Sequence, residues 1–286
     1  MNGPPRSPAS AAGLLATALL VSISSRAVSD DWPRRAQRSG TWLPAPREIA
    51  LAIRGSGAYV PEVSGLSTAE TGIAIGSLAW CLAPWEGIAL VGEHSLGRMW
   101  WGEQSLLISG HELGARFSLY RYFSMEAAYL GHASEKQWVE ENEVALGGVR
   151  DDGAELGAWF HAEPIGKLRV GLHLLGRYFD VYRHQQLVAG LGARVGLMPV
   201  AGHALEIELE ALRARRYRPR SGVDEISWNL LGSIEWRSRI AGDFGVSIGG
   251  RVSTHLLVGE MPMLELKRSM IDEPMALASL GLFFVI

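Results

Sequence analysis

Four consecutive segments, 166–181, 185–198, 203–215 and 224–238, carry charged side chains at positions that alternate with apolar residues. Alternate residues of an extended strand point to the same face, so these charges share one face of each predicted strand. The first two segments supply basic groups and the third supplies glutamates. We call this set the charge cluster, and it comprises Arg169, His173, Arg177, Arg194, Glu206, Glu208, Glu210, Glu235 and Arg237.

The charge cluster has two possible roles if the strands close into a barrel. It could line a polar channel whose internal field selects solutes. Alternatively, ion pairs could fill the interior and close it, because an unpaired buried charge is costly and small barrels are usually filled by side chains. In both cases the short turn at 199–203 joins the strand of Arg194 to that of Glu206 and Glu208. We therefore expect these groups to lie within pairing reach.

A second pair of residues could support nucleophilic chemistry. His132 and Ser134 fall on one face of a strand end, with glutamates nearby at 135, 140, 141 and 143. A histidine oriented by a carboxylate can activate a serine hydroxyl. This His-x-Ser arrangement is similar to that of outer-membrane lipid A deacylases, and the resemblance implies a lipid-modifying hydrolase. Glu135 stands where those enzymes often have Asn. Both side chains could instead be ordinary polar groups of a loop. We favour this interpretation and expect the protein not to be an enzyme.

The elements that carry these residues alternate between apolar and polar side chains from Glu48 onward. In segment 185–198, for example, Leu187, Leu191 and Val195 oppose Gln186 and Arg194. Such strands exceed the usual length of about five or six residues in soluble proteins. The connections also alternate between short turns and longer loops, the longer ones being predicted at 60–71, 94–104, 134–153, 216–224 and 259–272. The same asymmetry is expected of outer-membrane barrels.

The pattern predicts an all-β fold, a closed antiparallel transmembrane β-barrel of about twelve strands. The expected strands are 48–59, 71–82, 87–97, 104–118, 122–134, 153–163, 166–181, 185–198, 203–215, 224–238, 243–258 and 273–286. An even number places both chain ends on the periplasmic side. The first three strands alternate less clearly, so ten strands remain an alternative. Aromatic side chains gather at both predicted membrane boundaries, as Trp228 and Trp236 illustrate.

The last strand carries a pattern that resembles the C-terminal insertion signal of bacterial outer-membrane β-barrels. Ser279 and Gly281 share one face, and Phe284 and Ile286 share the other; Ile286 departs from the usual terminal Phe or Trp. This resemblance implies a porin-like barrel of the Gram-negative outer membrane. It also implies contact with outer-membrane lipids and with the barrel-assembly machinery through this strand. Other envelope proteins are further candidate partners.

The N-terminal region predicts export. Arg6 precedes an apolar stretch, 11–23, which has the length of a signal-peptide core. We expect residues 1–29 to be a signal peptide, 30–47 a periplasmic leader and 48–286 the barrel; an uncleaved membrane anchor is the alternative for 1–29. Basic and acidic residues number 27 and 30, so no basic excess indicates nucleic-acid binding. Cys81 is the single cysteine, and no histidine spacing matches a metal motif, so we expect no cofactor.

Overall fold

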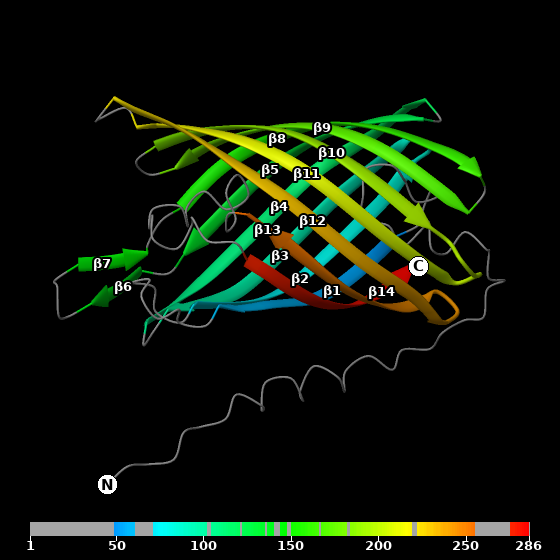
Figure 1. Ribbon diagram of the computed structural model, residues 1–286, viewed down its shortest axis with the longest axis horizontal. Coiled ribbons are helices and arrows are strands. Elements are labelled where there is room, and N and C mark those ends of the chain that lie inside the picture. The colour runs from blue at the N-terminus through cyan, green and yellow to red at the C-terminus, as the bar shows by residue number, and fades with distance from the viewer. Residues whose placement is uncertain are drawn as a thin grey trace, which may run out of the picture.

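The protein is a barrel of β-strands, as the computed structural model shows (Figure 1). The structure describes residues 49–60, 71–101, 104–120, 122–134, 136–139, 144–147, 150–165, 167–181, 184–218, 222–254 and 275–285. The predicted signal peptide and periplasmic leader therefore lie outside the described residues, as does Ile286. Within the described ranges no helix is long and apolar enough to span a membrane.

Twelve antiparallel strands close on one another, so the prediction of twelve is confirmed and the alternative of ten is wrong. Each barrel strand pairs with the barrel strands before and after it, β5 pairing with β8 across the intervening β6 and β7, and β14 pairs with β1 to complete the ring. The barrel strands are β1 Ile49–Val60, β2 Thr71–Trp85, β3 Ile88–Trp101, β4 Gln104–Tyr120, β5 Phe123–Ser134, β8 Arg150–Ile165, β9 Leu168–Val181, β10 His184–Leu197, β11 His203–Arg218, β12 Val223–Ala241, β13 Phe244–Ser253 and β14 Met275–Val285.

The two ends of the barrel differ as predicted, although several strands extend farther at the outer end than the sequence indicated. Tight turns close the end where β14 stops, and Gly87 and Gly202 adopt positive φ angles of 75° and 80° in two of them. At the opposite end, the predicted loops at 94–104 and 216–224 are mostly strand, because β3, β4, β11 and β12 extend past the expected boundaries. The strand barrel is therefore taller there than the alternation pattern suggested.

One element was not predicted. Segment 134–153, expected to be a loop, contains the short strands β6 (Lys136–Val139) and β7 (Val144–Gly147), which pair in a separate two-stranded sheet. This hairpin projects from the end of the barrel opposite the C-terminus (Figure 1). It lies on the side that faces the cell exterior in a barrel whose short turns are periplasmic.

The outer surface of the barrel is a continuous apolar belt. Large aliphatic side chains point outward from neighbouring strands and are more than half exposed, including Leu172, Leu191, Leu209, Leu230, Ile248 and Leu280. Monomeric soluble proteins rarely expose apolar patches larger than a few hundred Å². Trp228 and Trp236 both face outward and are eight residues apart on β12. That spacing corresponds to roughly 20 Å along the membrane normal for a tilted strand, close to the height of an outer-membrane apolar band.

Candidate functional site: the charged interior of the barrel

The alternation of each strand turns the charge cluster toward the interior. On β11, Glu206, Glu208 and Glu210 are buried or half-buried, whereas Leu209 between them is 64% exposed on the outer surface. The adjacent strand β10 places Arg194 directly opposite Glu208. Arg194 donates from Nη2 to Oε1 of Glu208 at 2.7 Å, and its Nε lies 3.2 Å from Oε1 of Glu206. The arginine therefore bridges two carboxylates of one strand.

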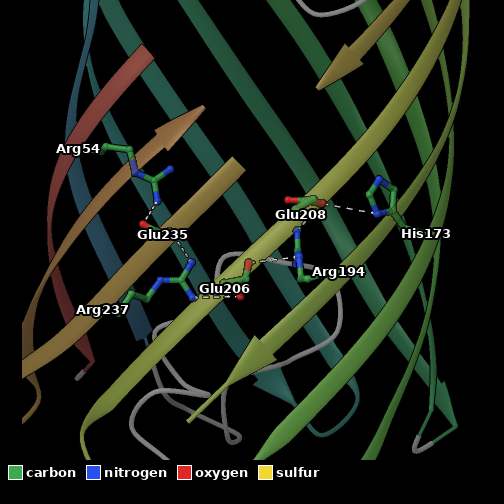
Figure 2. A network of polar contacts seen from close by, with 7 residues as sticks. All are labelled: Arg54, His173, Arg194, Glu206, Glu208, Glu235 and Arg237. Carbon is green, nitrogen blue, oxygen red and sulfur yellow. Dashed lines mark hydrogen bonds and ion pairs between the residues drawn. The ribbon is translucent and has the colours of Figure 1, made fainter. Parts of the chain in front are cut away.

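The contacts continue from Glu206 around the inner face (Figure 2). Arg237 donates from Nη1 to Oε2 of Glu206 at 3.4 Å and from Nη2 to Glu235 on its own strand. Glu235 also accepts a hydrogen bond of 2.9 Å from Nη2 of Arg54. Arg54 belongs to β1, so this pair spans the two intervening strands β13 and β14. One connected chain of charges thus links four strands, β1, β12, β11 and β10.

Small residues make this crossing possible. Glu235 pairs with Gly249 on β13, and Gly249 pairs with Ser279 on β14, so no bulky side chain separates Glu235 from Arg54. Gly281 on β14 lies directly opposite Arg54. Ser279 and Gly281, which the sequence assigned to an insertion signal, therefore face the interior and leave room for the Arg54–Glu235 pair.

His173 ends the chain of charges on β9 (Figure 2). Its side chain is 3% exposed, with Nδ1 at 3.6 Å from Glu208 and Nε2 at 3.6 Å from Glu210. The ring lies against Trp159 with centroids 4.3 Å apart and covers the backbone of Gly192. A Cβ at position 192 would lie 2.0 Å from Cε1 of His173, so only glycine fits there. Trp159 also lies beneath Arg194, whose Cζ is 5.2 Å from the ring centroid.

Two further ion pairs were not predicted. Arg116 on β4 donates from Nε to Glu126 on β5 at 2.7 Å, with both side chains buried, and Arg177 on β9 donates to Glu155 on β8. Each pair is placed symmetrically about a short turn, so hairpin register could have identified it from the sequence. Arg169, predicted to belong to the charge cluster, is buried and faces the interior nearer the short-turn end of β9.

These groups surround an internal cavity of about 560 Å³. Among the described residues that line it, eight are glutamates and six are arginines. The glutamates are Glu93, Glu112, Glu126, Glu155, Glu206, Glu208, Glu210 and Glu235, and the arginines are Arg54, Arg116, Arg177, Arg194, Arg237 and Arg251. The interior is therefore not completely filled by its ion pairs, and its lining has an excess of acidic groups.

Toward the outer end, the inner face carries a group of apolar side chains, with buried polar side chains such as Gln186 and Asn229 beside them. Six buried side chains from β5, β9, β10, β11 and β12 pack together, and we call them the apolar layer: Leu130, Phe179, Val188, Leu212, Ala214 and Leu231. On β11 this layer begins two residues beyond Glu210, so it follows directly on the charges. The sequence analysis predicted the charges on the inner face of this strand and did not predict the apolar layer beyond them.

The His132 and Ser134 pair also faces the interior. Nδ1 of His132 lies 2.7 Å from Oδ1 of Asp151, and the side chain of Asp151 is completely buried. The backbone N–H of His132 donates to the same oxygen at 3.1 Å. Asp151 belongs to β8 and was missed, since the sequence suggested glutamates at 135, 140, 141 and 143, all of which lie outside the described residues. His132 lines the cavity, and Ser134 follows it on the same inner face of β5.

No family model and no curated protein matches the chain. Solved structures do match it. An outer membrane channel from Pseudomonas putida F1 is 11% identical, with 86% of this chain and 97% of that chain covered and a TM-score of 0.59. The translocator domain of the autotransporter NalP from Neisseria meningitidis is 10% identical, with coverage of 89% and 94% and a TM-score of 0.56. LpxR from Salmonella typhimurium is 7% identical, with coverage of 81% and 99% and a TM-score of 0.50.

Identities this low establish the fold alone. Three observations indicate the same fold, a membrane-spanning β-barrel: the closed ring of strands, the apolar belt and the solved structures that the chain resembles. The chain has the fold of bacterial outer-membrane β-barrels, so the predicted fold class is confirmed, and the apolar belt agrees with the predicted outer-membrane location.

Proposed function

We propose that the protein is a narrow channel for small polar solutes and that it favours cations. The main support for this proposal is the cavity inside the barrel, which eight carboxylates and six guanidinium groups line. Ion selectivity in channels follows from the charges that line the pore. The excess of carboxylates lowers the energy of a cation in the cavity relative to that of an anion, so the lining itself indicates the preferred charge.

The ion pairs and the apolar layer limit what passes. Arg194, Arg237 and Arg54 each contact a carboxylate at 2.7 to 3.4 Å, so most of the lining charge is balanced locally. This balance makes the expected selectivity modest. Leu212 and Phe179 in the apolar layer are completely buried, and apolar constrictions can restrict conduction by excluding water. We therefore expect small conductance steps with long closed periods.

Replacing one carboxylate tests this proposal. Glu210 lines the cavity and contacts His173 at 3.6 Å. None of the arginine hydrogen bonds described above involves Glu210, so Glu210→Gln removes an acidic charge and leaves those bonds in place. Planar-bilayer recordings under a salt gradient should show a weaker cation preference for this variant than for the wild type. Glu86→Gln, at an exposed turn residue, is the matched control and should behave like the wild type. A wild-type protein without current would instead favour a filled barrel with a structural or docking role.

A hydrolase is the second candidate function, and Asp151 favours it. A carboxylate that accepts a hydrogen bond from Nδ1 of a histidine leaves Nε2 free to act as a base, as in serine hydrolases. His132 and Asp151 have this relationship at 2.7 Å, and Ser134 lies two residues along the same face. In this hypothesis Ser134 is the nucleophile, His132 the general base and Asp151 the residue that orients the ring.

A fluorophosphonate probe separates the two candidates. A hydrolase should label covalently in the wild type and lose labelling in both Ser134→Ala and His132→Ala. Ser233→Ala, which changes another serine that lines the cavity, is the control and should leave the labelling intact. Absence of labelling in the folded wild-type protein would contradict the hydrolase hypothesis and leave the channel proposal untouched.

A further inference from the structure

The outer surface of β11 changes character near its outer end. Leu209 lies within the apolar belt, but beyond Ala211 the outward positions hold Arg213, Arg215 and Tyr217, all exposed. The inward positions between them hold Leu212 and Ala214 of the apolar layer. Successive side chains of a strand point to opposite faces. Because Leu212 and Ala214 point inward, Arg213 and Arg215 point outward. Two arginines therefore face the membrane side of the barrel at this level.

Arg213 lies at the boundary of the apolar belt. It is directly opposite Trp228 on β12, and its Cζ is 5.9 Å from the centroid of the indole ring. Trp228 is 56% exposed and lies near the outer end of the belt, eight residues from Trp236; Ile226, 52% exposed, is the next residue outward on this face of β12. Tryptophan is enriched where the hydrocarbon meets the headgroups. The guanidinium is thus held against an aromatic ring at the depth of the lipid headgroups.

The two arginines differ in their charge partners. Arg215 binds Asp224 through Nε at 2.9 and 3.0 Å and through Nη2 at 2.5 Å, so its charge is balanced. Among the described residues, Arg213 contacts no carboxylate. Its outward neighbours across the strands are Ala189 on β10 and Trp228 on β12. Within the part of the chain that the structure describes, the charge of Arg213 is therefore not balanced by a carboxylate, and it faces the outer surface of the barrel.

We propose that Arg213 and Trp228 form a binding site for the phosphate group of a phosphorylated outer-leaflet lipid. A guanidinium presents paired N–H donors that match phosphate oxygens, and it is more weakly hydrated than an ammonium group. The indole fixes the guanidinium, and Leu209 and Leu230, 64% and 58% exposed, offer the acyl chains an apolar surface. This site lies outside the barrel and is independent of the proposed channel.

Lipid retention tests the proposal. The full-length protein is purified in mild detergent and incubated with lipid A carrying both phosphates or with fully dephosphorylated lipid A, and bound lipid is counted by native mass spectrometry. The wild type should retain about tenfold more phosphorylated lipid, the effect of a charge-assisted bidentate interaction. Arg213→Ala should abolish this preference, and Arg213→Lys should reduce it. Lys167→Ala, which removes an exposed basic residue near a short turn, should match the wild type.

Three outcomes would overturn the proposal: equal retention of the two lipids by the wild type, an unchanged preference in Arg213→Ala, or displacement of the lipid by inorganic phosphate at the same concentration. The last would identify a site for free phosphate. Slower gel migration after heating confirms that each variant is folded before its lipid is counted.

Discussion

Arg194 and Glu208 lie directly opposite each other on β10 and β11, and their side chains form a hydrogen bond of 2.7 Å inside the barrel. The same guanidinium lies 3.2 Å from Glu206, so one arginine balances two carboxylates. Arg237 and Arg54 extend these contacts to β12 and β1. We therefore expect the stability of the barrel and its ion selectivity to depend on a small number of arginines. Arg194 is the most central of them.

Removing that arginine should affect both stability and conduction. Arg194→Ala leaves Glu206 and Glu208 without their shared partner in a site where the arginine side chain is only 10% exposed. We expect the free energy of unfolding to fall by on the order of 3 kcal/mol, because it leaves uncompensated buried charge. The reversal potential under a salt gradient should also shift in the direction that indicates greater cation selectivity. Urea unfolding in lipid vesicles and bilayer recordings measure the two effects.

Arg215→Ala is the control for this experiment. Arg215 also binds a carboxylate, but the pair is exposed on the outer surface, with side chains 59% and 38% exposed. Exposed pairs contribute little to stability. If Arg215→Ala destabilised the protein as much as Arg194→Ala, the interior pair would have no special role.

Adjacent residues on β12 test which face is lined by lipid. Ile234 is 51% exposed on the outer belt, whereas Ser233 lines the cavity opposite Glu208. Ile234→Arg places a charge in the apolar belt and should cost about 2–4 kcal/mol near the membrane centre. Ser233→Arg gains a nearby carboxylate and should cost less. The folded fraction is measured by heat-dependent gel migration, and a more harmful Ser233→Arg would reverse the assignment of the two faces.

The apolar layer should restrict conduction. Leu212 is completely buried and packs with Phe179 and Val188. Leu212→Asn keeps a similar volume but attracts water, so the open probability in bilayer recordings should rise several-fold. Leu212→Met, which remains apolar, should leave the currents near those of the wild type. Identical currents from all three proteins would mean that the layer does not limit conduction.

The closing strand should govern assembly. Phe284 faces outward and lies 5.0 Å, ring to ring, from Phe244 on β13. Phe284→Ala removes this contact and the aromatic residue of the predicted insertion signal, so less folded protein should reach the outer membrane. Ala276→Ser changes an exposed residue at the other end of the same strand and serves as the control. Quantitative immunoblots of membrane fractions give the amounts. Equal amounts of the two variants would show that Phe284 is not needed for insertion.

The sequence predicted the barrel because polar and apolar residues alternate with few exceptions, and that pattern also placed Arg194 beside Glu208. It did not predict the apolar layer. Leu209 and Leu212 are both leucines in one strand, and only their odd separation places one in lipid and the other inside. It also missed Asp151, since the link between His132 and Asp151 crosses from β5 to β8 around the β6–β7 hairpin.

The sequence also did not predict close contacts between side chains of neighbouring strands. By alternation alone, Gly192 is an ordinary inner position of β10, on the same face as Arg194. In the structure, the ring of His173 lies directly over it, so any side chain there would collide. Whether an inner position has free space depends on the neighbouring strand, which a single strand's alternation cannot reveal.

The reversal potential of the wild-type protein in a planar bilayer, measured under a potassium chloride gradient, tests the central claim most directly. A narrow channel lined by eight carboxylates and six guanidinium groups should give discrete current steps and a reversal potential on the cation-selective side of zero. A folded protein that gives no current, or one whose reversal potential indicates anion selectivity, would contradict the account.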